Sequence, residues 1–91
     1  MSDYTFATVI ILDADKQQAQ QDLGDGFFTV PLSPTGEEPS TNWMSSGPFN
    51  DSELNFVVNE ATWPKKIYFG QDWQAALAAE GLEIVQPVAT V

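Results

Sequence analysis

Asp13 and Asp15 are the residues of this 91-residue chain whose types and spacing best suit a metal ion. They follow an apolar segment with the composition of a buried strand, and Asp25 lies at a later turn. Carboxylate oxygens suit Mg²⁺ or Ca²⁺. The segment lacks the glycine and the later glutamate of a calcium-binding loop, however, and Asp13 can instead cap a helix whose positive end Asp15 favours. We therefore favour a structural role for both residues and expect no metal and no cofactor.

Other catalytic chemistry has little support in the residue types. The chain has no cysteine and no histidine, which removes the usual ligands of zinc, haem and iron–sulfur clusters and the usual base for a serine nucleophile. A serine–lysine pair would need Lys65 or Lys66, but no serine has a spacing that selects it. These lysines also suit the start of an edge strand. The chain also has no P-loop and no arginine, so phosphoryl transfer has no support either. We expect a protein that is not an enzyme.

An apolar set of side chains is the stronger candidate for a functional surface. Residues 33–64 hold two of the three tryptophans, together with a methionine and two phenylalanines. Tryptophan and methionine are enriched in protein contacts, and tryptophan often anchors them. We predict that Trp43, Met44, Phe49 and Trp63 bind a protein partner or a second copy of the chain. The alternative is that they cover the core, because a small domain needs most of its aromatic residues for packing.

The charge balance excludes some classes of partner. The formal net charge is −10, from 13 acidic residues and only three lysines. Direct binding to nucleic acid or to an anionic membrane is not expected, because few cations are present to contact phosphate groups. No apolar run approaches the ~20 residues of a membrane span, and the first residues lack the basic region of a signal peptide. We expect a cytoplasmic protein.

The elements that must position these residues are read from hydrophobic periodicity and helix-capping signals. Strands are predicted at 4–12, 26–32, 65–69 and 82–86, and helices at 14–23 and 73–80. Asp72 and Gly81 are expected to bracket the second helix as its N-cap and its C-terminal glycine. Thr41–Met44 is expected to form a short edge strand, and Ser45–Pro48 a turn. Residues 51–59 fit either a short helix or a strand, and we favour the helix.

These elements predict a single α+β domain over residues 1–91. Two strand–helix–strand units flank an irregular insert at 33–64, and residues 87–91 form a tail. The simplest architecture is a two-layer sandwich with a small mixed or antiparallel sheet and two to three helices. A split βαβ, or ferredoxin-like, arrangement is one version of it.

Two stretches of the sequence resemble small uncharacterised proteins of tailed bacteriophages and prophages. One is Trp43–Phe49 followed by Asp51–Leu54, and the other is Tyr68–Leu77 leading to Gly81 and Leu82. They cover about a third of the chain, and the similarity supplies no catalytic or binding residues. The resemblance implies an accessory or assembly protein, located in the host cytoplasm or in the virion.

Three functions from different classes remain open on the sequence. The leading hypothesis is a non-enzymatic interaction or assembly module that contacts its partner through the aromatic-rich insert. The alternative is an acidic decoy that occupies the basic groove of a nucleic-acid-binding protein, for which the net charge would give fast association. The least favoured is a metal-dependent enzyme that uses Asp13 and Asp15.

Overall fold

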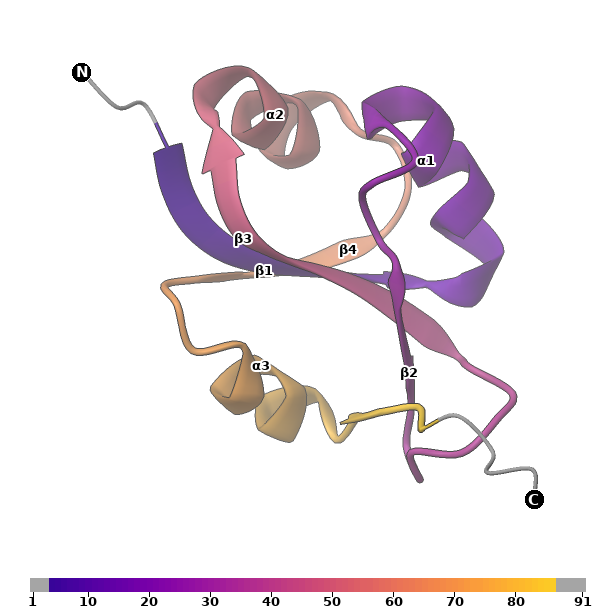
Figure 1. Ribbon diagram of the computed structural model, residues 1–91. Coiled ribbons are helices and arrows are strands. Elements are labelled where there is room, and N and C mark those ends of the chain that lie inside the picture. The colour runs from indigo at the N-terminus through magenta and orange to yellow at the C-terminus, as the bar shows by residue number, and fades with distance from the viewer. Residues whose placement is uncertain (1–3, 87–91) are drawn as a thin grey trace.

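One open antiparallel sheet organises the computed structural model, which describes residues 4–86 (Figure 1). Its strands are β1 (Tyr4–Leu12), β2 (Val30–Ser33), β3 (Asn42–Asn50), β4 (Lys65–Phe69) and β5 (Glu83–Ile84). Their order across the sheet is β4-β1-β3-β2-β5. β1 and β3 pair along their full length and form the centre of the sheet. The predicted tail at 87–91 lies outside the described residues.

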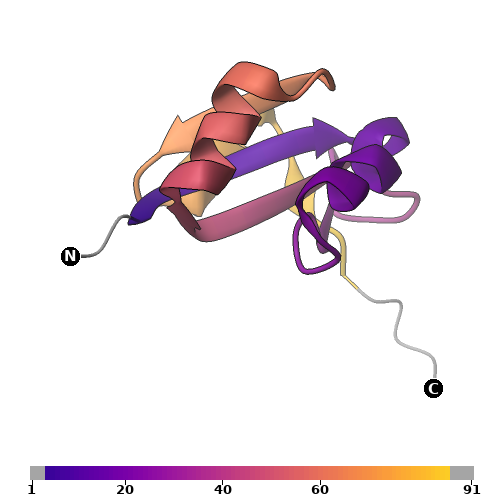
Figure 2. The same ribbon diagram turned by 90° about the horizontal axis from the view of Figure 1, so that it is seen from above.

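The helices lie on both faces of this sheet (Figures 1 and 2). The helical elements are a 3-10 turn (Asp13–Asp15), α1 (Lys16–Leu23), α2 (Asp51–Asn55), a π-helical turn (Phe56–Glu60) and α3 (Trp73–Glu80). α1 and α2 cover one face, whereas α3 covers part of the other (Figure 1). None of the helices in the described part of the chain is long and apolar enough to cross a membrane.

The connections form two interleaved strand–helix–strand units. α1 joins β1 to β2, which are parallel and separated by β3, and α2 joins β3 to β4, which are parallel and separated by β1. This is the split βαβ, ferredoxin-like connectivity, and α3 and β5 extend it beyond β2. The predicted α+β class, with an antiparallel sheet and three helices, is confirmed. The sheet and the layer of α1 and α2 form the predicted two-layer sandwich, and α3 partly covers the opposite face (Figure 1). The strand–helix–strand succession predicted at 65–69, 73–80 and 82–86 is present as β4–α3–β5, but β4 and β5 lie at opposite edges of the sheet. The second unit of the split βαβ is instead β3–α2–β4, which the sequence prediction missed.

Residues 42–50 form a central strand, which corrects the prediction of an irregular insert at 33–64 and of a turn at Ser45–Pro48. Gly47 has a φ of 145°, which glycine adopts readily, so the strand continues through the segment. Pro48 is tolerated because its nitrogen points away from β1. β2 pairs only with residues 42–44, so this part of β3 has an open outer edge where no donor is needed.

The helix ends follow local rules that the sequence carries. Asn50 and Glu53 form a reciprocal capping box at the start of α2. Asp72 accepts a hydrogen bond from the Ala75 N–H over 3.1 Å and caps α3. Gly81 ends α3 in the left-handed conformation with the paired hydrogen bonds of a Schellman motif. The helix predicted at 51–59 and the capping of α3 are confirmed.

Two local predictions are wrong near the start of the chain. Asp13 makes no capping hydrogen bond to α1, because its carboxylate binds elsewhere. The predicted strand at 26–32 begins only at Val30, because Phe28 turns the chain with a φ of 57° and is fully buried.

Each face of the sheet has its own hydrophobic core. The core beneath α1 and α2 contains Ala7, Val9, Ile11, Ala19, Phe28, Phe49, Val57 and Trp63. The smaller core beneath α3 contains Ile10, Leu32, Met44 and Leu77. Because strand side chains alternate between faces, β1 and β3 contribute to both cores.

Candidate functional site

Trp43, one of the predicted contact residues, is held by Asp13 of the 3-10 turn and by Lys16, the first residue of α1. Its indole Nε1 donates a hydrogen bond to Oδ1 of Asp13 over 2.5 Å. The Lys16 Nζ lies 3.7 Å from the centroid of the ring, which is a favourable cation–π geometry. Trp43 is only partly buried, and it packs at the margin of the core beneath α1 and α2. Its polar edge and one of its ring faces are therefore already occupied within the chain.

Trp63 is a core residue, which corrects its predicted role as a contact residue. Its side chain is 4% exposed, and its Nε1 donates to Oδ2 of Asp22 over 2.9 Å. The ring of Phe28 meets it edge-on, with the centroids 5.6 Å apart. A partner could reach this indole only if the packing between α1 and the sheet opened.

Met44 and Phe49 are also buried, so neither can contact a partner as predicted. Both lie on β3, and they belong to the two different cores because they are an odd number of residues apart. Their exposed fractions are 4% and 2%. The sequence prediction failed because it placed this segment in an insert, whereas pairing with β1 makes it a central strand.

Asp13 and Asp15 lie in the 3-10 turn between β1 and α1. The Asp13 carboxylate is bound to Trp43, and within residues 4–86 no group of three or more histidine, cysteine, aspartate or glutamate side chains gathers as metal ligands would. The pair lies at the surface of a 3-10 turn. These residues connect α1 to the sheet.

An aromatic surface that the sequence prediction missed lies at the start of β1. Tyr4 and Phe6 are 61% and 42% exposed, and Pro48 is exposed directly opposite Phe6 on β3. All three share the sheet face of Ile10, because strand residues of equal parity point to one side. We call Tyr4, Phe6 and Pro48 the aromatic surface. Single exposed apolar residues scattered over a surface are ordinary, whereas these three are neighbours on one face and form a continuous group.

The aromatic surface is open because α3 is too short to cover it. α3 has eight residues and is therefore ~12 Å long. β1 has nine residues and spans ~30 Å. α3 packs over Ile10 and Met44 and leaves the Tyr4 end uncovered. The lengths of the predicted strand and helix were the signal in the sequence that could have revealed this surface.

All three lysines lie toward the C-terminal end of β1, where Lys65 and Lys66 pair with residues 11 and 10, and Lys16 lies just beyond the strand. Asp13 and Asp15 follow β1 at the same end, so the charge there is mixed. At the other end of the sheet, Asp51 begins α2 directly after the residue paired with Tyr4, and Asp72 lies two residues beyond the one bonded to Phe6. This end of the sheet therefore combines apolar rings with negative charge.

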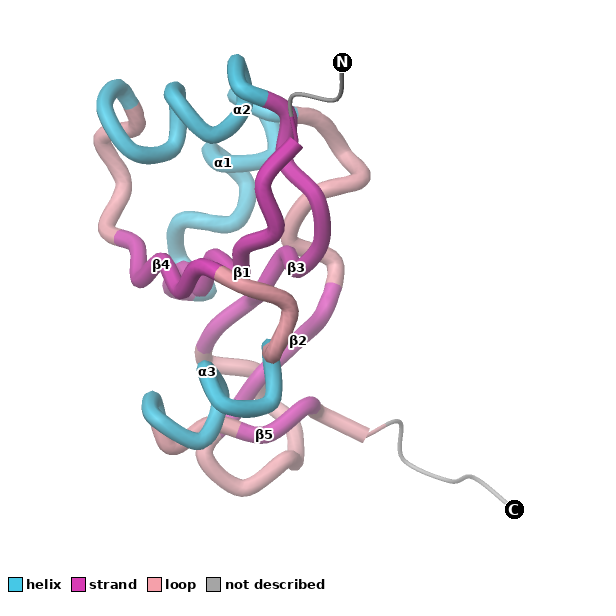
Figure 3. Tube along the Cα trace, turned by 90° about the vertical axis from the view of Figure 1, so that its left-hand side faces the viewer, coloured by secondary structure: helices cyan, strands magenta, loops and turns pink. Residues whose placement is uncertain are grey.

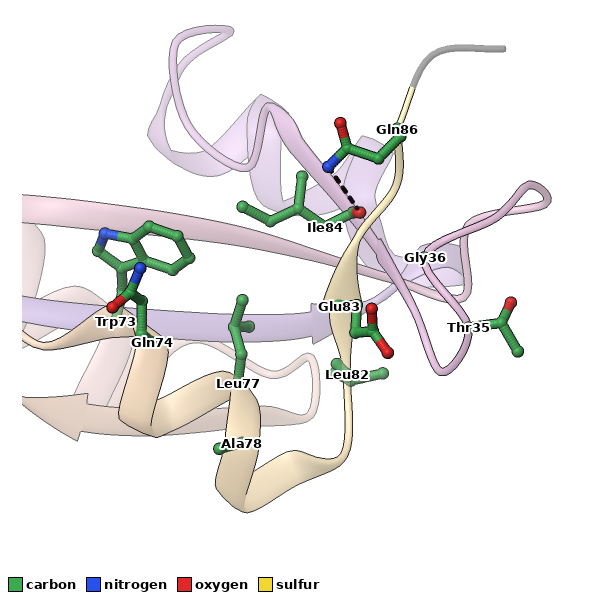
Figure 4. Close-up of a pocket in the computed structure, with 10 residues that line it drawn as sticks. All are labelled: Thr35, Gly36, Trp73, Gln74, Leu77, Ala78, Leu82, Glu83, Ile84 and Gln86. Carbon is green, nitrogen blue, oxygen red and sulfur yellow. Dashed lines mark hydrogen bonds between the residues drawn. The ribbon is translucent and has the colours of Figure 1, made fainter.

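A shallow cleft of about 450 Å³ lies between α3, β5 and the loop after β2 (Figure 4). The apolar side chains of Trp73, Leu77, Leu82 and Ile84 line it, and Glu83 is on its rim. The polar side chains of Thr35, Gln74 and Gln86 also line it.

Tyr68 and Glu80 form a hydrogen-bonded pair on the α3 face, in which the tyrosine hydroxyl donates to Oε2 of the carboxylate. This bond raises the pKa of Tyr68 above its ordinary value of 10.0, and burial and the negative charge of Glu80 add to the effect. Glu80 and Lys66 both line a second hollow, of about 300 Å³, beside the C-terminal end of β1. The pair joins α3 to β4.

No protein-family model, no curated protein and no solved structure matches this chain.

Proposed function

We propose that this protein is a non-catalytic interaction module that binds a basic partner protein through Tyr4, Phe6 and Pro48. The observation that carries the proposal is the exposure of two aromatic side chains, 61% and 42%, at neighbouring positions on one sheet face. Aromatic rings are the side chains that contribute most to protein contacts, because they bury a large area with few rotatable bonds.

The charges near the aromatic surface select the partner's chemistry. Asp51 and Asp72 would repel phosphate groups, so nucleic acid and anionic lipid are unsuitable ligands at this end of the sheet. A lysine- or arginine-rich protein segment is attracted by the same carboxylates, and its apolar side chains can pack on Phe6. The net charge of −10 adds long-range attraction and speeds the encounter.

A titration with a synthetic peptide of alternating lysine and leucine residues tests the proposal. Amide chemical shifts of the protein should change around Tyr4, Phe6 and Asn50. The Phe6→Ser variant should bind this peptide at least about tenfold more weakly, which corresponds to about 1.4 kcal/mol. Leu12→Ser is the matched control, because Leu12 is 47% exposed on the same face of the same strand but lies at the lysine-bearing end. The proposal fails if Leu12→Ser weakens binding as much as Phe6→Ser does, or if a glutamate–leucine peptide binds equally well.

The acidic decoy is the second candidate, and the net charge of −10 favours it enough to test. A decoy held by charge alone should dissociate in about 1 M salt, where the Debye length is about 3 Å. Binding through the aromatic surface should persist in part, because burial of apolar rings does not depend on screening. Equal binding by the wild type and Phe6→Ser, together with complete loss in high salt, would favour the decoy.

A further inference from the structure

We propose that a second copy of this chain docks along the free edge of β4, antiparallel and centred on Ile67, and extends the sheet across a two-fold axis. β4 is the last strand on its side of the sheet within the described residues. In Figure 3 it lies at the outer side of the sheet, between α2 and α3. The site is separate from the aromatic surface and does not depend on the function proposed for it.

Hydrogen-bonding groups are available along this edge. The Gly70 N–H donates to the Phe6 carbonyl oxygen over 2.8 Å. In an antiparallel pair the residues of a strand point their backbone groups alternately toward and away from the partner strand, so this bond shows that the even-numbered residues of β4 bond to β1. The N–H and C=O groups of Lys66 and Tyr68 therefore point toward β1. Those of Lys65, Ile67 and Phe69 point outward, where an added strand would pair with them.

The order of side chains in β4 is self-complementary in one antiparallel register. With Ile67 opposite its own copy, Lys65 lies opposite Phe69 and Lys66 opposite Tyr68 in each half of the dimer. Lys66 then faces an aromatic ring, and no lysine faces a lysine. The Lys65 ammonium donates to the Ala61 carbonyl oxygen of its own chain over 3.2 Å. A shift that places Lys66 opposite its own copy is disfavoured by repulsion of like charges. The lysines that protect this edge from general strand pairing thus permit this one register.

Glu80 supplies a charge that complements the docked lysine. In the proposed register Lys66 and Tyr68 form a non-hydrogen-bonded pair, in which opposing side chains approach most closely. The Tyr68 hydroxyl already binds the Glu80 carboxylate. Lys66 of one copy therefore comes within reach of Glu80 of the other, and the two-fold axis creates this contact twice.

Phe69 adds the apolar component of the proposed interface. It is 65% exposed, the highest fraction among the large apolar side chains described, and its backbone lies on the open edge. The contact involves a five-residue strand and is smaller than the about 800 Å² per partner of standard interfaces. A weak dimer follows, with a dissociation constant on the order of 10–100 µM.

Two measurements on the wild-type protein test the dimer without a substitution. Sedimentation at concentrations from about 10 µM to about 1 mM should show a reversible monomer–dimer equilibrium. Over the same range, hydrogen exchange at the Ile67 and Phe69 amides should slow at least about tenfold, because these protons become bonded between the copies. The inward-pointing amides of Lys66 and Tyr68 provide the internal reference.

A charge exchange tests the register. Lys66→Glu and Glu80→Lys should each weaken dimerisation at least about tenfold, because each places like charges together across the axis. The double variant should recover most of the wild-type affinity. Gln17→Glu with Gln21→Glu controls for net charge, since both residues are exposed on α1 and the pair changes the charge as much as Lys66→Glu does.

Recovery of dimerisation in the double variant, with the α1 control unchanged, supports docking along β4. A protein that stays monomeric at about 1 mM with unchanged exchange at Ile67 overturns the proposal, as does a dimer that Lys66→Glu leaves intact. Dimerisation that is lost with Phe6→Ser and not with Lys66→Glu would assign self-association to the aromatic surface instead.

Discussion

The carboxylate of Asp22 accepts a hydrogen bond from the indole of Trp63 over 2.9 Å and joins α1 to the segment that precedes β4. Asp13 binds Trp43 in the same way near the other end of the helical segment. Each indole also has a lysine near its ring, Lys65 at 5.5 Å from Trp63 and Lys16 at 3.7 Å from Trp43. Two of the most chemically distinctive side chains of this protein therefore serve to attach α1 to the sheet.

Removal of the carboxylate at Asp22 should destabilise the protein. Asp22→Ala leaves the nearly buried Trp63 Nε1 without its acceptor, and we expect the free energy of unfolding to fall by about 1–3 kcal/mol. Asp22→Asn should cost less, because its amide oxygen can still accept the bond. Urea denaturation followed by circular dichroism measures the difference. The exposed Asp25→Ala serves as the control, and an equal effect there would contradict a specific role for the Trp63 bond.

At position 28, a glycine variant should be more stable than an alanine variant, which is the reverse of the usual order. It is fully buried and has a left-handed φ of 57°, which costs a residue with a Cβ atom about 1–2 kcal/mol. Both Phe28→Ala and Phe28→Gly lose the ring and should destabilise by about 3–5 kcal/mol. We expect the glycine variant to be the more stable by about 1 kcal/mol, because it relieves the strain. Thermal unfolding of the two variants compares them directly. A more stable alanine variant would show that the left-handed conformation at position 28 does not strain a residue with a Cβ atom.

The capping box at α2 makes a measurable contribution to stability. Asn50→Ala removes the acceptor for the Glu53 N–H, and the free energy of unfolding should fall by about 1 kcal/mol. Ser52→Ala lies in the same turn but is exposed, so it should change stability by less than about 0.5 kcal/mol. Guanidinium denaturation of both variants tests the difference. Similar values for the two would show that packing alone holds the helix start.

Tyr68 should link stability to pH in the alkaline range. Its pKa is raised in the folded protein by the hydrogen bond to Glu80, so the folded state holds the phenolic proton more tightly than the unfolded state does. This stabilisation is complete below the ordinary value of about 10 and is lost as the pH rises through the folded pKa. In a Tyr4→Phe background, absorbance titration reports Tyr68 alone. Glu80→Gln should lower its pKa, and an unchanged titration would contradict the role of Glu80.

The sequence by itself determined the elements whose causes are local. The run of β-branched and apolar residues at 4–12 predicts β1 correctly, because strand preference and alternation act within the segment. Asp72 and Gly81 predict the ends of α3, because each makes its hydrogen bonds within one helical turn. Together with the length and composition, these elements were enough to indicate an α+β domain.

Only the tertiary structure decided what the middle of the chain does. Ser45–Pro48 has the local composition of a turn, but pairing with β1 along its whole length makes it part of a central strand. That pairing buries Met44 and Phe49, and Trp63 is enclosed when α1 packs on the sheet. The predicted lengths of β1 and α3 indicate that part of the strand stays uncovered, but only the tertiary structure decides which face α3 covers and which end of β1 it leaves open. These outcomes arise from contacts between residues far apart in the chain, and neighbouring residues carry no signal for them.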